Sequence, residues 1–178
     1  MNILILKGSG NRRGSSALLA DEFARGAREA GHEVSEYDVV HADIRNCTGC
    51  NACGMAGACV LKDDYEHELK DLIRAADMLV FAFPVYYYNW PAQVKAVVDR
   101  FYSFTYELTG MRKKAVMLTV AWDNDGTVFR IVDAYYDRIC EYMHFEDCGR
   151  VEGGGCGTPE MTRSTRFPQA AYDLGKSL

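Results

Sequence analysis

The sequence predicts an α/β protein with a doubly wound, five-stranded parallel sheet and helices on both faces. Short apolar runs that suit buried strands alternate with longer segments that carry helical spacing. The first of these runs is followed by a loop of glycine and serine that opens a helix. Right-handed crossovers then place helices on both faces of the sheet. The 178 residues suffice for one domain, spanning 1–178, around one core.

The first half of the chain supplies two strands and two helices. Residues 2–7 are almost wholly apolar and predict a buried strand. Residues 17–30 carry helical spacing, and residues 33–40 alternate weakly, which favours an edge strand. Residues 41–62 carry neither period and predict a long functional loop. Asp63 and Asp64 can then cap a helix whose inward face repeats apolar residues through Ala76.

The second half continues the alternation. Residues 77–83 predict a third strand, which ends before Pro84 and an aromatic loop, and a helix opens at Pro91. Residues 114–121 predict the fourth strand, followed by another helix, and residues 145–151 predict the fifth. A glycine-rich stretch and a polar tail with one short helix complete the chain.

Ligands of such sheets bind at the carboxyl ends of the strands. The loops expected on that rim are therefore residues 8–16, 41–62, 84–90, 122–126 and 153–157. We expect the first three of them to face one crevice.

The loop at 8–16 predicts a phosphate site. It lies at a helix N-terminus, where free N–H groups and the helix dipole attract an anion. Serine hydroxyls, an amide and two arginines lie within reach, and the polar candidates include Ser9, Asn11, Arg13, Ser15 and Ser16. The alternative is that Ser15 or Ser16 merely caps the helix. The loop matches neither the Walker A pattern nor a clean dinucleotide fingerprint.

The aromatic loop suggests what the phosphate belongs to. Tyr86, Tyr87, Tyr88 and Trp90 can stack on a flat heteroaromatic ring, and FMN combines such a ring with a phosphate. The alternative is that some of these rings are core packing or a subunit contact. No acid or base from the protein is required for electron or hydride transfer at a flavin.

Four cysteines in the loop at 41–62 predict a metal site. Cys47, Cys50, Cys53 and Cys59 follow the pattern C-x2-C-x2-C-x5-C, close to the run that binds an iron–sulfur cluster in bacterial ferredoxins. Zinc, and free or disulfide-switching thiols, are the alternatives. The remaining Cys140 is expected in the core, whereas the roles of Cys148 and Cys156 stay open.

Composition excludes other classes of function. The net charge of −5, without a basic stripe, argues against nucleic-acid binding. No apolar run reaches the length of a membrane span, and the N-terminus carries no leader pattern, so we expect a cytoplasmic protein.

Several of these motifs occur together in one known family. The serine-rich loop, the cysteine loop followed by Asp63-Asp64, the run FPVY at 83–86 and the run WPAQVKAVVDR at 90–100 resemble the NADPH-dependent FMN reductase branch of flavodoxin-like proteins. Within it, the sequence is most similar to the iron–sulfur flavoproteins, over roughly residues 2–125. Gly10 and Ser16 depart from that family's usual proline and threonine.

The resemblance implies a flavodoxin-like fold and assigns roles to residues. Phosphate contacts fall on the polar loop residues named above, and ring contacts on Pro84, Val85, Tyr86 and Tyr87. The cluster ligands are the four loop cysteines, holding a [4Fe–4S] cluster. Such proteins form homodimers or homotetramers, with each cluster near a neighbouring flavin, and exchange electrons with carriers such as ferredoxin.

Three functions remain open at this stage. The first is electron transfer between a [4Fe–4S] cluster and FMN. The second is an NAD(P)H-dependent FMN or quinone reductase without a cluster. The third is a redox-sensing binding module in which the cysteine loop switches a partner surface. The sequence does not name the donor or the acceptor.

Overall fold

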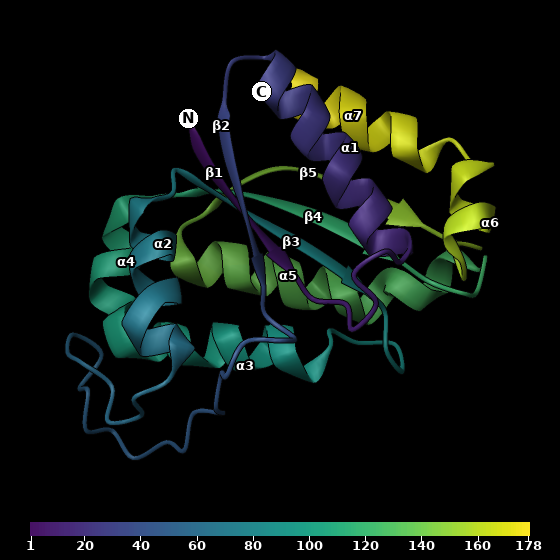
Figure 1. The fold of residues 1–178 in the computed structure, drawn as a ribbon. Helices are drawn as coiled ribbons and strands as arrows, with labels where there is room; N and C mark the ends of the chain where they lie inside the picture. Colours follow the sequence, from purple (N-terminus) through teal and green to yellow (C-terminus); the bar gives the residue numbers. More distant parts are fainter.

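The computed structural model describes all 178 residues and contains one five-stranded parallel sheet (Figure 1). Its strand order is β2-β1-β3-β4-β5. The strands are β1 (Asn2–Lys7), β2 (Glu33–Asp38), β3 (Met78–Pro84), β4 (Lys114–Val120) and β5 (Glu146–Gly153). The predicted fold class and the edge position of the second strand are confirmed.

Helices cover both faces of the sheet, and each layer has its own apolar core. One face carries α1 (Ser15–Glu29) and α7 (Phe167–Lys176), which pack on residues such as Ile5, Val80 and Leu118. The opposite face carries a π-helical turn (Tyr65–Leu69) with α2 (Lys70–Ala75), then α3 (Ala92–Arg100), α4 (Thr105–Met111) and α5 (Arg130–Met143). A short helix, α6 (Pro159–Arg163), precedes α7. No helix has both the length and the apolar character needed to cross a bilayer.

Two helices differ from expectation. Helix α4 was not predicted, because its seven residues are too few for a helical period to stand out. Only a short helix was predicted in the tail, where α7 runs for ten residues against α1. Gly26 and Gly175 permit this packing, because a Cβ on Gly26 would lie 2.1 Å from the carbonyl oxygen of Tyr172. Glycine usually destabilises a helix interior, but at these two positions it allows the two helices to pack closely.

The loops at the carboxyl ends of β1, β3 and β4 share one rim, but the cysteines do not lie on it. Figure 1 shows the long loop after β2 turning away from that rim and running past α3 toward α4 and α2. Tyr102 Oη donates to Asn51 Oδ1 at 2.7 Å, and Tyr106 N donates to Met55 O at 3.4 Å. Helix α3 separates these contacts from the aromatic loop by about 13 Å, at 1.5 Å per residue. The expectation that the cysteine segment faces the same crevice is therefore wrong.

An ion pair explains the path of the loop. Arg100, at the end of α3, donates to both carboxylate oxygens of Asp63 at 2.7 and 3.1 Å, and both side chains are buried. The same guanidinium donates to Arg45 O at 3.0 Å. Both ends of the cysteine segment are thereby fixed at the far end of α3.

Candidate functional site

The loop after β1 is shaped by its own polar groups. Asn11 N donates to Ser9 Oγ at 3.2 Å, and Arg13 N donates to Asn11 Oδ1 at 3.1 Å. Gly14 N donates to Asn11 O at 3.0 Å, which closes the turn into α1. These bonds are local, so the loop holds its shape without a ligand.

The N-terminus of α1 leaves its donors free. Gly14 is the N-cap residue and offers no side chain, so neither Ser15 nor Ser16 caps the helix. The first N–H groups therefore lack partners within the helix. Ser15 is only 7% exposed, and its hydroxyl has no hydrogen-bond partner. A buried, unpartnered hydroxyl beside free N–H groups at a positive helix end is a site built for an anion.

Gly8 brings this loop against the neighbouring strand. A Cβ on Gly8 would lie 2.1 Å from Val94 Cγ2 and 3.1 Å from Phe83 Cβ, so only glycine fits. Gly8 N donates to Ala82 O at 2.8 Å. The loop at residues 8–16, which we call the anion loop, is consequently held beside the end of β3, where the aromatic loop at residues 84–90 begins.

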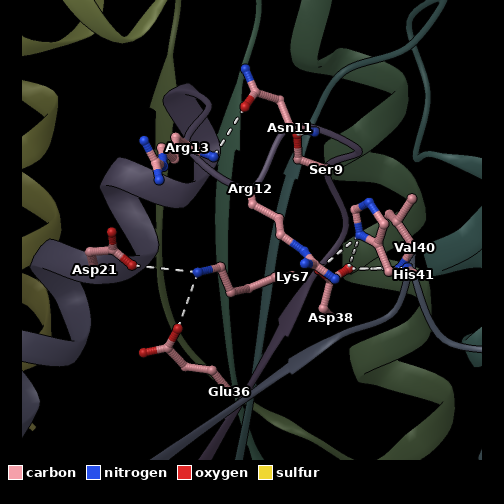
Figure 2. A network of polar contacts seen from close by, with 10 residues as sticks. All are labelled: Lys7, Ser9, Asn11, Arg12, Arg13, Asp21, Glu36, Asp38, Val40 and His41. Atoms are coloured by element: carbon pink, nitrogen blue, oxygen red, sulfur yellow. Dashed lines mark hydrogen bonds and ion pairs between the residues drawn. The ribbon is translucent and has the colours of Figure 1, made fainter.

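A charged network flanks the anion loop on its β2 side (Figure 2). Arg12 Nε donates to Asp38 Oδ2 at 2.9 Å, and His41 Nδ1 lies 2.8 Å from the same oxygen. Partial burial works against ionisation, but the contacts with His41 and Arg12 hold the pKa of Asp38 below its ordinary value. His41 therefore contacts the Asp38 carboxylate through its side chain.

A cavity of about 200 Å³ opens between this network and the anion loop, lined by Lys7, Ser9, Asn11, Arg12, Ser16, Ala17, Glu36, Asp38 and Ala82. Arg12 and Arg13 differ in whether they form an ion pair. Arg12 is tied to Asp38, whereas Arg13 forms no ion pair, so its guanidinium is the cation free to meet an anion.

The aromatic loop is a tight, strained turn. Tyr86 N donates to Asn89 O at 3.0 Å, and Asn89 N donates to Tyr86 O at 3.1 Å. Between them Tyr87 and Tyr88 adopt φ values of 48° and 64°, a left-handed region that bulky residues rarely occupy. Tyr87 is 100% exposed, and more than half of each flanking tyrosine is exposed. Three rings are held out to solvent at the rim.

Pro84 and Val85 connect this turn to the sheet. Pro84 ends β3, and Val85 N donates to Val120 O at 2.8 Å. Val85 also packs against Ala121 and Phe129. The base of the turn is thus fixed to β4 while its tip stays open.

Trp90 does not lie on the rim. It is 5% exposed, its ring lies 4.6 Å from Phe83 and 5.1 Å from Phe81, and its Nε1 donates to Val132 O. We correct the expectation that it contacts a ligand, because it supports the aromatic loop from the core. The exposed indole of the rim is Trp122, which is 73% exposed. Its ring packs over Gly157, where a Cβ would come within 2.0 Å.

The four cysteines of the long loop are unpaired. Cys47 and Cys50 are exposed, Cys53 is partly exposed and Cys59 is buried. A hydrogen bond from the backbone of Ala52, helped by Thr48, lowers the pKa of the Cys50 thiol. Four thiols match an iron–sulfur cluster in number and chemistry. No three His, Cys, Asp or Glu side chains converge in a metal-binding arrangement, so the donors are present but not assembled.

Charged side chains fasten the end of the loop that carries Cys59. Cys59 N donates to Glu66 Oε1 at 3.1 Å, and Lys62 Nζ donates to Cys59 O at 3.0 Å. Lys70 Nζ donates to Gly57 O at 3.2 Å and pairs with Glu66. The last cysteine is therefore held, whereas the first two are not.

The other cysteines lie outside this loop. Cys140 is buried in the core beneath α5, as expected. Cys156 is buried too, and its N–H donates to Ala121 O at 2.8 Å. Cys148 is partly exposed on β5. None of the three is exposed at the rim.

A doubly wound parallel sheet with a glycine- and serine-rich loop after its first strand and an exposed aromatic turn beside it places the chain in the class of α/β proteins whose ligands bind at the carboxyl ends of the strands. The chain belongs to the family described as having a flavodoxin-like fold, whose model matches residues 1–176.

Relatives and solved structures agree with this assignment. Over 100 residues, the chain is 35% identical to a protein named iron-sulfur flavoprotein from Archaeoglobus fulgidus, and the match covers 56% of this chain and 45% of that protein. The chain spans about half the length of the curated relatives it matches.

Two solved structures share the fold. One is an NAD(P)H:quinone oxidoreductase from Methanothermobacter marburgensis, with TM-score 0.78 and 20% identity, covering 99% of this chain and 95% of that one. The other is an FMN-dependent NADH-azoreductase from Bacillus anthracis in complex with FMN, with TM-score 0.68 and 14% identity, covering 99% and 96%.

Proposed function

We propose that this protein is an FMN-dependent oxidoreductase that passes electrons between a [4Fe–4S] cluster and FMN. One observation carries the flavin assignment: the buried, unpartnered Ser15 hydroxyl at the uncapped N-terminus of α1, beside the exposed aromatic turn. Relatives named iron-sulfur flavoprotein support the second cofactor. When bound, FMN supplies one- or two-electron chemistry and the cluster one-electron chemistry.

The phosphate of FMN would be held by the anion loop. The cavity beside this loop is lined by Ser9, Asn11 and Ser16. Ser15 offers its free hydroxyl, and Arg13 offers an unpaired guanidinium. Charge-assisted bonds to a phosphate are about twice as strong as neutral ones. These groups bind and orient the cofactor rather than react with it.

The flavin ring would lie against the turn that follows β3. Pro84 and Val85 fix the base of that turn, and Tyr86 and Tyr87 offer ring faces to a flat ligand. We add Trp122 as a further stacking surface and leave out Trp90.

The cluster would be held by Cys47, Cys50, Cys53 and Cys59. Their number and type fit, and the free state of all four thiols leaves them available. Since Cys59 is fastened and the first two cysteines are exposed, cluster binding would draw the exposed end of the loop inward. Metal binding commonly supplies the free energy for such ordering.

An oligomer follows from the separation of the two sites. The cysteine segment lies at the far end of α3 from the flavin rim of its own chain. Electron transfer over a short distance would therefore use the rim of a neighbouring copy. We propose a homodimer or homotetramer that exchanges electrons with a small carrier such as ferredoxin.

A second function is an NAD(P)H-dependent flavin or quinone reductase without a cluster. Two observations favour it: the cysteines do not converge, and a solved structure of the same fold is an NAD(P)H:quinone oxidoreductase. It predicts that NAD(P)H alone bleaches the flavin rapidly, with no iron present.

Iron, acid-labile sulfide and FMN per chain, measured in protein purified without oxygen, separate the two functions. The electron-transfer function predicts about four irons and four sulfides per FMN, the content of a [4Fe–4S] cluster. FMN without iron or sulfide supports the reductase. No flavin at all contradicts both.

The ligand set has its own test. Cys50→Ala removes one proposed ligand, and Cys148→Ala is the matched control outside the loop. Iron content should fall in the first variant and stay at the wild-type level in the second. Full iron content in Cys50→Ala would show that the ligand set is wrong.

A further inference from the structure

Two buried side-chain oxygens without hydrogen-bond partners belong to neighbouring residues on the α5 face of the sheet, the buried Thr119 and the half-buried Glu152. Thr119 of β4 is paired in register with Glu152 of β5, so both side chains point to the same face about 4.8 Å apart. Thr119 is 0% exposed, and its Oγ1 has no partner. Glu152 Oε1 is also buried and without a partner. Such pairs of orphaned oxygens are uncommon because each costs free energy.

Carboxylates from α5 and β5 crowd the same place. Arg150, two residues before Glu152, bonds to Asp133 at 3.4 Å, to Asp137 at 2.7 Å and also to Asp147. Arg150 and Glu152 pair in register with Met117 and Thr119 of β4, so both side chains lie on the same face of the sheet. One guanidinium therefore faces three aspartates, and the carboxyl group of Glu152 lies on the same face beside them. Arg166 lines the adjoining groove but forms no ion pair with them.

A proton fits this arrangement better than a metal ion. Arg150 already occupies the centre of the aspartates, and no group of three acidic, histidine or cysteine side chains there is arranged for a metal. Two carboxyl groups in contact are stable when they share one proton. A protonated Glu152 also becomes a donor, which Asp133 or Thr119 can accept.

We propose that Glu152 and Asp133, with the Thr119 hydroxyl beside them, form a proton-binding site that is linked to reduction of the bound flavin. The site lies next to the flavin rim. Glu152 directly precedes Gly153, whose carbonyl accepts from Ala121 N, and Trp122 of the rim follows Ala121. This link rests on the proposed function, whereas the proton site itself does not.

The chemistry of the link is an uptake of one proton. Two electrons from the donor that enter the flavin with fewer than two protons leave negative charge at the rim. The carboxylate of Glu152 then takes one proton from water and becomes a carboxylic acid. No electron passes through the pair, and the proton returns to water when the flavin is oxidised.

The charges around Glu152 favour this uptake. Burial raises the pKa of Glu152 to about 7, with contact and repulsion from Asp133 adding to it and Arg150 opposing it. Asp137 on α5 also raises it. The site therefore changes protonation near neutral pH, where a nearby charge shifts its occupancy most.

The proton site is tested in the chain without flavin, by following the carboxyl carbon of Glu152 in an NMR pH titration. Glu152→Gln identifies the signal, and Glu146→Gln, an exposed carboxylate at the start of the same strand, is the control. We expect Glu152 to titrate two or more pH units above the ordinary glutamate value of about 4.3. A midpoint near the ordinary value of about 4.3 overturns the site. If Glu152→Gln does not fold, Asp133→Asn serves, and it should lower the midpoint of Glu152.

The link is tested by repeating the titration with FMN bound, oxidised and reduced. We expect the midpoint of Glu152 to rise on reduction, and the pH dependence of the flavin potential near neutrality to change in Glu152→Gln but not in Glu146→Gln. An unchanged midpoint overturns the link and leaves the proton site standing. Failure to bind FMN refutes the proposed function as well as the link, while the flavin-free titration still reports on the proton site.

Discussion

The anion loop at 8–16 and the cysteine segment at 47–59 differ in how much of each site exists before its ligand binds. The anion loop is shaped by short polar turns, and the N–H groups of the first turn of α1 are left free by the absence of a side-chain cap. The cysteine segment supplies its ligands from side chains on an irregular loop, and these do not converge. The proposed phosphate site, made largely of backbone, would be present when the chain folds, whereas the proposed cluster site, made of thiols on an irregular loop, would need its metal to complete it.

The anchor of the cysteine segment should give the largest effect on stability. Arg100→Met leaves the buried Asp63 carboxylate with only the longer 3.9 Å contact to Arg45 as an ion pair, which costs up to about 3–5 kcal/mol. Denaturant unfolding measures the loss. Arg74→Met is the matched control, since the ion pairs of Arg74 are exposed and worth at most about 1 kcal/mol. Equal losses in the free energy of unfolding of the two variants would contradict the conclusion that the Arg100–Asp63 ion pair anchors the cysteine segment.

The free hydroxyl of the anion loop should affect affinity rather than stability. Ser15→Ala removes a buried, unpartnered oxygen, so the flavin-free protein should be as stable as wild type or slightly more stable. FMN affinity should fall by about 10- to 100-fold, the equivalent of one hydrogen bond to a charged group.

Ser103→Ala is the matched control for Ser15. Its buried hydroxyl donates to Arg100 O at 3.0 Å, so its loss should lower stability by about 1 kcal/mol and leave FMN affinity unchanged. Thermal unfolding and calorimetric titration of both variants give the comparison. A loss of stability in Ser15→Ala without a loss of affinity would refute an anion role for the hydroxyl.

The network beside the anion loop should respond to acid. The pKa of Asp38 is lowered in the folded protein, so its contribution to stability is present above the ordinary carboxyl pKa and is lost as the pH falls through the folded value. Asp38→Asn should cost about 0.5–1 kcal/mol at neutral pH, because the network is partly exposed, and less at an acid pH below the ordinary carboxyl pKa. Unfolding at the two pH values checks this, and an equal cost at both would exclude an ionic contribution.

The smallest effect concerns the thiols themselves. Without metal, Cys47 and Cys50 should react with a thiol reagent well before Cys59, because only the first two are exposed. The lowered pKa of Cys50 should make it the faster of the pair. Mass spectrometry of partly labelled protein gives the order. Simultaneous labelling of all three would mean that the segment is uniformly open.

The contrast between the anion loop and the cysteine segment also explains which features could be predicted from the sequence. Hydrophobic patterning was enough for the three central strands, β1, β3 and β4, since buried parallel strands are continuous apolar runs, whereas the edge strands β2 and β5 are more polar and carry a weaker signal. The anion loop was predictable because its features are local to nine residues. The course of the cysteine segment depends on Asp63 and Arg100, which are 37 positions apart, and no local pattern pairs them.

The burial of individual side chains is the other feature that could not be predicted from the sequence. Trp90 and Trp122 both stand in loops at strand ends, yet one packs in the core and the other is exposed. The difference arises from the aromatic residues that surround Trp90, contributed by β3 and α5. The pairing of Thr119 with Glu152 likewise depends on the register of two strands. Both features depend on tertiary structure, and neither the motifs nor the hydrophobic periodicity of the sequence indicates them.

Calorimetric titration of the flavin-free protein with FMN and with riboflavin tests the central claim most directly. The two ligands share the ring and differ by the phosphate that the anion loop is proposed to hold. A preformed phosphate site predicts that FMN binds at least about 100-fold more tightly, roughly two charge-assisted hydrogen bonds. Equal affinities would show that the loop after β1 is a turn and not a phosphate site.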